Sequence, residues 1–377
     1  MSALVPSFAK INLGLHIGKL RADGFHELRT VYQTIALHDL ISVSLQRGSG
    51  IEIRCEDPRV PTDSSNTCYK IIERAIDVLK APGRVVIEIE KRLPVQGGLG
   101  GASGNAVAAL LALECALRQQ LSAAEKLRIA AEVGSDIPLF LIGGTVLGVG
   151  HGEEVYPLPD SPPMPCVIGL PNVAVSTPKA FADWDRTYGG VSCEGTSGTL
   201  DAIGISRIEG TSMLGKTSAT SKAATSSRAE QTRPPTSNAK LTVPAHSDRM
   251  LKFSREISAW LNAVPSTGGR RSGVSARGGG RAESPLLDLV RTGIENDFER
   301  VVFPKYPELL EVKRVLEKEG ARYASLSGSG SAIYGLFDSQ KKATAAAKKL
   351  AQSGTQAVVT STLTRQQYWK RLLATSS

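Results

Sequence analysis

Hydrophobic and polar residues alternate in short stretches along the first part of the chain, and this pattern predicts β-strands. Residues 11–17 and 85–90 each predict one strand, and residues 31–43 predict two. Residues 105–119 are apolar on most helical faces, so they predict a buried helix. This part of the chain therefore combines strands with at least one core helix.

Helices and strands are also predicted further along. Ser122 and Glu125 have the spacing of a capping box, which opens a second helix that Gly134 ends. Near the C-terminus, the patterns predict an amphipathic helix, a strand and another helix, at residues 307–319, 332–337 and 340–352. Strand and helix recur throughout, which predicts an α+β fold.

The 377 residues suggest two domains, and we place them at residues 1–160 and 161–377. The second domain is interrupted at about 188–285 by a segment rich in Ser, Thr, Gly and Arg. Such a composition buries too little apolar surface to offset the entropy of ordering. We therefore predict a disordered, low-complexity insertion, with one helical pattern at residues 252–264.

Composition limits the functional class. Hydrophobic residues make up 41% of the chain, which excludes disorder of the whole chain. No apolar run reaches the roughly 18 residues of a membrane helix, and the first residues lack a signal-peptide pattern. Five cysteines without a C-x-x-C pair indicate neither a disulfide framework nor a zinc site. We expect a cytoplasmic protein without a membrane partner.

The net charge of +9 raises the question of a nucleic-acid partner. Residues 188–285 contain 13 Lys and Arg against 7 Asp and Glu, a net charge of +6. The remainder then contains 32 against 29, a net charge of +3. Since most of the basic charge belongs to the insertion, we expect no nucleic-acid partner.

A glycine-rich run at residues 94–104 precedes the predicted buried helix. Glycines let the backbone approach a ligand closely, and a helix start offers free N–H groups and a positive dipole end. This arrangement favours an anion such as a phosphate chain, although a flexible turn would have the same composition. The run matches neither the P-loop nor the dinucleotide-binding fingerprint. A second Gly/Ser loop at residues 325–332 either is a simple turn or covers the same phosphates.

Two further segments carry polar side chains that suit chemistry. Asp136 precedes Pro138, where it would serve as a helix N-cap or as a general base. Lys10 and Asn12 share one face of an alternating strand, which indicates either a polar cleft or a solvent-exposed face. The residues alone do not decide between these pairs of roles.

Taken together, these segments resemble the GHMP kinase family. The similarity lies in seven motifs in the family's order, namely AKINLGL, RADGFHEL, PVQGGLGGASGNA, GSDIPLF, STPKAF, ENDFE and SLSGSGSAIYG. The combination of the first, second and fourth motifs is typical of members that phosphorylate the C2 hydroxyl of a cytidine-diphosphate methylerythritol in the non-mevalonate isoprenoid pathway. The resemblance implies an N-terminal half like ribosomal protein S5 and a ferredoxin-like C-terminal half.

The resemblance also implies roles for individual residues. Asp136 would be the base and Lys10 its catalytic partner, which stabilises the ionised carboxylate. The ATP-binding residues would be Pro94, Val95, Gln96, Gly97, Gly98, Leu99, Gly100, Gly101, Ala102, Ser103 and Gly104, with Asn66 and Lys91 at the adenine. Ser103, the only hydroxyl of the loop, would also meet Mg²⁺.

The cytidine-diphosphate substrate would contact Asn12, Phe25, His26, Thr177 and Phe181. Phe25 and Phe181 would sandwich the cytosine, while His26 hydrogen-bonds its edge. Three alternatives stay open at this point: another small-molecule acceptor such as homoserine, mevalonate or a sugar; a nucleotide sensor without catalysis; and an RNA-associated protein that uses the basic insertion. The sequence is compatible with a monomer or a homodimer.

Overall fold

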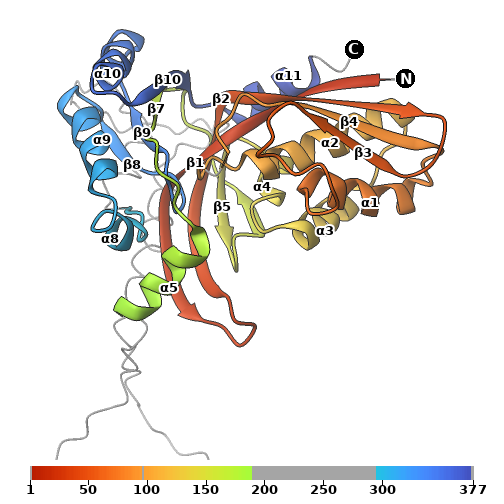
Figure 1. Cartoon of the computed structure of the whole chain (residues 1–377), viewed down its shortest axis with the longest axis horizontal. Helices are drawn as coiled ribbons and strands as arrows, with labels where there is room; N and C mark the ends of the chain where they lie inside the picture. Colours follow the sequence, from red (N-terminus) through yellow and green to blue (C-terminus); the bar gives the residue numbers. More distant parts are fainter. Residues whose placement is uncertain (1, 96, 189–293, 375–377) are drawn as a thin grey trace, which may run out of the picture. The chain divides into compact units, whose positions relative to one another are not determined.

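The computed structural model describes residues 2–95, 97–188 and 294–374 (Figure 1). Almost all of the predicted insertion, including the helix expected at residues 252–264, lies outside the described residues. The same is true of Gln96. Within the described part, no helix is both long and apolar enough to cross a membrane.

A six-stranded sheet forms the first part of the fold. Its strands are β1 (Ser2–Leu20), β2 (His26–Gln46), β3 (Ile51–Cys55), β4 (Arg84–Glu90), β5 (Thr145–Val149) and β6 (Glu154–Pro157). The order is β3-β4-β2-β5-β6, with β1 paired to β2. All neighbours are antiparallel except β3 and β4. The alternating pattern thus predicted strands within β1, β2 and β4, but not β3, β5 or β6. The two long strands β1 and β2 reach beyond the other members of the sheet (Figure 1).

One expected break in this sheet is absent. Residues 31–43 were predicted as two strands, but they lie within the single strand β2. Register shifts against β1, for example between Phe8 and Ala9, bend the pair without ending it. A bulge adds an unpaired residue and increases the local twist, and in sequence this looks like a break in the alternation. The prediction of two strands was therefore wrong.

Four helices that precede β5 in the chain belong with this sheet: α1 (Thr67–Leu79), α2 (Gly101–Leu117), α3 (Ala123–Val133) and α4 (Pro138–Ile142). Helix α2 begins at Gly101, four residues before the predicted start, because Gly100 takes a left-handed conformation that sets the helix boundary. The capping box of Ser122 and Glu125 and the end of α3 at Gly134 are confirmed.

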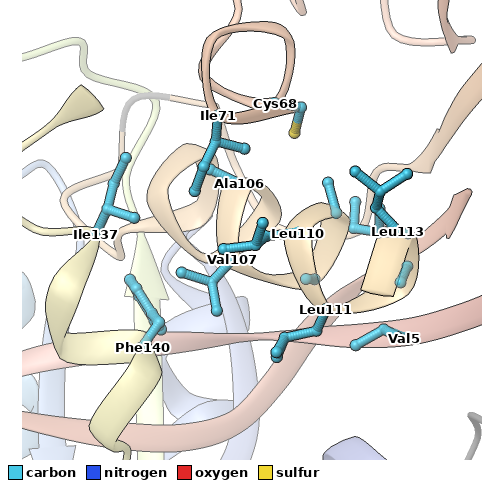
Figure 2. Close-up of a cluster of buried hydrophobic side chains, with 14 of the residues drawn as sticks. Val5, Cys68, Ile71, Ala106, Val107, Leu110, Leu111, Leu113, Ile137 and Phe140 are labelled. Carbon is cyan, nitrogen blue, oxygen red and sulfur yellow. The ribbon is translucent and has the colours of Figure 1, made fainter. Parts of the chain in front are cut away.

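Helix α2 is the core helix of this part, as its apolar composition predicted. It packs against β1, β2 and α1. Figure 2 shows Ala106, Val107 and Leu110 of α2 among Ile71 and Phe140. All five side chains are 1% exposed or less, so the helix that follows the glycine run is fixed in place.

The second sheet has the order β10-β7-β9-β8 and is antiparallel throughout. Its strands are β7 (Pro165–Leu170), β8 (Tyr323–Leu326), β9 (Ile333–Leu336) and β10 (Gln356–Ser361). The accompanying helices are α5 (Thr177–Tyr188), α8 (Glu299–Val302), α9 (Pro307–Lys318) and α10 (Gln340–Gln352). Helix α11 (Arg365–Leu373) follows β10 in the chain but packs against β1 of the first sheet. The predictions for α9, α10 and β9 are confirmed, within one residue at each end.

A shared core joins the two sheets. It contains Ile11 and Leu13 of β1 together with Ile168 of β7 and Tyr334 of β9. The phenol of Tyr334 donates a hydrogen bond to the carbonyl of Asn12 at 2.8 Å. Because β1 contributes to this core on one face, the polar residues on its other face are held in a fixed position.

Candidate active site

Lys10 and Asn12 lie together on one face of β1, as the alternation predicted. They are 3% and 1% exposed, so they do not form a solvent-exposed face. The Lys10 ammonium donates to Asn12 Oδ1 at 2.7 Å, and Asn12 Nδ2 donates to the Thr30 hydroxyl at 2.7 Å. A buried ammonium group needs such partners, because removing a charge from water is costly. The pair therefore forms a built polar site.

Asp136 lies between α3 and α4 and faces Lys10. Its Oδ2 is 3.4 Å from the Lys10 ammonium, and its Oδ1 accepts a hydrogen bond from the Tyr32 phenol at 2.9 Å. Ile137 caps α4 without a side-chain bond, so the N-cap role considered for Asp136 does not apply. The Asp136 side chain is 36% exposed, which leaves the carboxylate accessible from the adjoining cavity.

Tyr32 was missed by sequence reasoning, since an aromatic residue in a strand usually signals packing. Burial raises the pKa of the Tyr32 phenol well above its usual value, and the charge of Asp136 raises it further. The phenol is therefore protonated at neutral pH and acts only as a donor to the carboxylate. This donor fixes the orientation of Asp136.

The glycine run forms a close-fitting cradle beside Lys10. Gly98 and Gly100 have φ angles of 72° and 70°, a region that favours glycine. A Cβ at Gly98 would lie 2.1 Å from the Ser327 carbonyl oxygen, and one at Gly100 would lie 2.9 Å from the Phe140 ring. The run leads directly into α2, whose first N–H groups lack partners within the helix.

The second Gly/Ser loop lies against the glycine run. The Ser327 hydroxyl donates to the Gly98 carbonyl at 3.0 Å, and the Ala332 N–H donates to the Gly97 carbonyl at 3.1 Å. The Ser329 hydroxyl is 2.7 Å from that of Thr177 at the start of α5. The loop therefore links the glycine run to α5.

Asn296 holds this second loop, a role that the motifs did not predict. Its side-chain amide donates to the carbonyls of Leu326 and Gly328, both at 2.8 Å. Glu299 accepts from the Leu326 N–H at 2.9 Å. The ENDFE motif, which contains both residues, thus supports the loop from behind.

Two cavities meet at the glycine run. One, of about 590 Å³, is lined by Lys10, Asn12, Phe25, His26, Asp136, Thr177 and Phe181 among others. The other, of about 350 Å³, is lined by Asn66, Lys91, Pro94, Val95, Gly97, Leu99, Gly101 and Ala102 among others. Gly98, Gly100 and Ser103 line both. We call the first the acceptor cavity and the second the donor cavity.

Most of the predicted site residues therefore surround one continuous site. Gly104 is the exception among the described ones, because it packs against the backbone of Phe8 rather than lining either cavity. A larger cavity of about 690 Å³ lies at the other end of α2 and contains none of the predicted residues.

The aromatic residues gather at one end of the acceptor cavity. The imidazole of His26 stacks on the Phe181 ring, with centroids 5.4 Å apart and planes 6° apart. Phe25 is 59% exposed and lies against His151, with ring centroids 4.7 Å apart. His26 therefore stacks on Phe181, and all three side chains line the predicted substrate end of the cavity.

Asn66 and Lys91 line the donor cavity but are held by other protein groups. Asn66 caps α1, where its side chain accepts from the Cys68 N–H at 2.8 Å. The Lys91 ammonium lies 2.7 Å from Asp39, a carboxylate outside the seven motifs.

Comparison with known proteins identifies the family. The family model for the N-terminal domain of GHMP kinases matches residues 66–144, and the model for the C-terminal domain matches residues 283–356. A curated relative from Solibacter usitatus is 30% identical over 371 residues, which cover 98% of this chain and 92% of the relative. The chain therefore belongs to the GHMP kinase family, whose two-domain fold combines α and β structure.

The relative from Solibacter usitatus is a 4-diphosphocytidyl-2-C-methyl-D-erythritol kinase. So is a relative from Acaryochloris marina, which is 31% identical over 91% of this chain and 89% of its own length. A solved 4-(cytidine 5'-diphospho)-2C-methyl-D-erythritol kinase shares 25% identity, with a TM-score of 0.61 over 96% of this chain and 99% of that one. Homoserine kinase from Cytophaga hutchinsonii has a TM-score of 0.62 at 19% identity over 97% and 96% of the two chains, which shows the fold alone.

Proposed function

We propose that this chain transfers the γ-phosphoryl group of ATP to the C2 hydroxyl of 4-diphosphocytidyl-2-C-methyl-D-erythritol. The observation that carries the proposal is the Lys10–Asp136 pair, with 3.4 Å between ammonium and carboxylate, in a cavity that shares Ser103 with the donor cavity. Phosphoryl transfer needs a donor and an acceptor held in line, with their charges neutralised. Two cavities that meet at a glycine cradle suit that need.

The proposed chemistry assigns one task to each charged group. Asp136 takes the proton of the acceptor hydroxyl, whose oxygen forms a bond to the γ-phosphorus as the bond to the β-phosphate oxygen breaks. ADP is the leaving group. The Lys10 ammonium stabilises negative charge on the attacking oxygen, and the Tyr32 phenol holds the carboxylate. General-base help of this kind contributes about 10²–10⁴ in rate.

The donor side of the proposal uses the glycine run. The phosphates of ATP lie along residues 94–104, beside the N–H groups at the start of α2. Asn66 and Lys91 line the cavity for the adenine end. Mg²⁺ binds phosphate oxygens together with few protein ligands, and the Ser103 hydroxyl, which lines both cavities, suits that role. The bound ion would neutralise phosphate charge.

The acceptor side uses the aromatic end of its cavity. Phe25, His26 and Phe181 offer aromatic rings to a cytosine, and Thr177 and Asn12 line the same cavity as Asp136. An acceptor such as homoserine or mevalonate has no nucleobase that could stack on these rings. This is the reason to favour the cytidine-diphosphate substrate over the other acceptors of the family.

We also propose that the chain has an S5-like N-terminal half at residues 1–160 and a ferredoxin-like C-terminal half at residues 161–377. A low-complexity insertion lies between α5 and α8. We also retain a cytoplasmic enzyme, active as a monomer or homodimer, in isoprenoid precursor synthesis, without a nucleic-acid partner.

The test is a coupled ADP-release assay with four acceptors: the cytidine-diphosphate substrate, homoserine, mevalonate and galactose. We expect turnover with the first alone, and a phosphorus–carbon coupling at C2 in the NMR spectrum of the product. Preferential turnover of another acceptor would replace the proposed substrate. ATP binding without turnover of any of the four would favour a nucleotide sensor.

A further inference from the structure

Asp39 is a buried carboxylate of β2 that lies outside the motifs and outside the proposed chemistry. It is 0% exposed. Its Oδ1 accepts from the backbone N–H groups of Arg92 and Leu93, both at 2.7 Å, and its Oδ2 accepts from the Lys91 ammonium at 2.7 Å. Three short, charge-assisted bonds converge on this one side chain.

The three donors are consecutive residues that connect strand β4 to the glycine run. Strand β4 ends at Glu90, and residues 91–93 lead from the sheet into the glycine run. Asp39 belongs to the neighbouring strand of the same sheet. It therefore ties the exit from β4 to the rigid sheet and sets the direction in which the glycine run begins.

The Lys91 ammonium also lies near the start of α2. A Cβ built on Gly101, the first residue of α2, would be 3.5 Å from it. The positive end of the helix dipole and the Lys91 ammonium thus face the same donor cavity, and they repel each other. The Asp39 carboxylate offsets this repulsion and holds Lys91 in place.

We propose that Asp39 is a positioning residue of the nucleotide cavity, which fixes the Lys91 ammonium and the entry to the glycine run for binding of a nucleoside triphosphate. The inference rests on the proposed function for the identity of the nucleotide. Asp39 acts on ATP affinity through Lys91 and has no part in the reaction of the alcohol.

The variant Asp39→Asn tests this, because its oxygen still accepts from the two backbone N–H groups while its amide faces the Lys91 ammonium. We expect the Kd and the KM for ATP to rise about tenfold, with kcat and the acceptor KM within about twofold of the wild type. Lys91→Met should weaken ATP binding similarly. The double variant should bind ATP no more weakly than Lys91→Met, because residues that act through one contact are not additive.

Glu114 of α2 supplies a matched control. It is a buried carboxylate that accepts from the Lys126 ammonium at 2.7 Å and from the Leu121 N–H at 2.6 Å, but it lines neither the donor nor the acceptor cavity. Glu114→Gln should lower the melting temperature as Asp39→Asn does, without changing the Kd for ATP. Equal effects of both variants on that Kd would show a general loss of stability and overturn the proposal.

Calorimetric titration with ATP keeps this test separate from the proposed function, because it needs no acceptor. If the wild type binds ATP but is inactive, the proposed reaction is wrong. The ATP affinity of Asp39→Asn still tests the role of Asp39 in that case. A folded Asp39→Asn with wild-type ATP affinity would overturn the inference. If Asp39→Asn does not fold, Lys91→Met decides: a folded Lys91→Met with unchanged Kd would overturn the inference as well.

Discussion

Two pairs of lysine and aspartate flank the glycine run, and their surroundings differ. In the pair of Lys91 and Asp39, the carboxylate is fully buried and accepts three bonds of 2.7 Å. In the pair of Lys10 and Asp136, the groups are 3.4 Å apart and the carboxylate is 36% exposed. Both pairs have the same composition, so composition does not explain their different roles.

The difference lies in how far each carboxylate is open to a substrate. Asp39 is fully buried and accepts three hydrogen bonds from protein donors, so it can hold a structure but cannot reach the proton of a substrate. Asp136 accepts one hydrogen bond, from Tyr32, and presents Oδ2 at the edge of a cavity. A buried carboxylate held by three donors is thus a structural anchor, whereas an accessible one beside an ammonium suits a base.

The largest expected effect on catalysis belongs to the substitution Asp136→Asn. We expect kcat to fall by about 10³, because general-base help is worth about 10²–10⁴. The Kd for ATP should stay within about twofold, since the amide keeps the shape of the carboxylate. Single-turnover kinetics and calorimetry would measure the two effects, and a kcat within a few fold of the wild type would remove Asp136 from the chemistry.

A second substitution, Lys10→Met, removes the cation and keeps the length of the side chain. We expect kcat to fall by about 10², because charge stabilisation at the attacking oxygen is lost. Combined with Asp136→Asn, it should add little, since the two groups serve one step. Fully additive effects in the double variant would show that the two residues act independently.

The smallest expected effect belongs to Tyr32→Phe. Loss of one hydrogen bond to the carboxylate should reduce kcat about fivefold, in line with a net value of about 1 kcal/mol for such a bond. The KM for ATP should not change, because Tyr32 lines only the acceptor cavity. An unchanged kcat would mean that Lys10 alone orients Asp136.

The sequence predicted local structure well where one physical signal was dominant. The capping box at Ser122 and the amphipathic pattern of α9 each gave an element with nearly correct bounds. Strand β2 was predicted as two strands, because bulges in its pairing with β1 interrupt the alternation although the ladder continues. That continuity depends on tertiary pairing, which a single sequence does not display.

For the site, the sequence predicted the residues that lie within motifs but missed the residues that hold them in position. Lys10, Asp136 and the glycine run were found from pattern and resemblance, and the structure brings them together. Asp39 and Tyr32 lie in an ordinary strand pattern and carry no local signature. Their partners are 52 and 104 residues away in sequence, so only the folded chain reveals them.

The strand pairing of the second sheet determines how much of the chain must be synthesised before the fold can be completed. Strand β7 precedes residues 189–293, whereas its partners β9 and β10 follow them. The loop at Ser327, which bonds to Gly98, also emerges late from the ribosome. A nascent chain released before about residue 361 therefore lacks both a complete second sheet and the closing segment around Leu363. A premature stop codon upstream of this residue should therefore yield an unstable product rather than a partly active kinase.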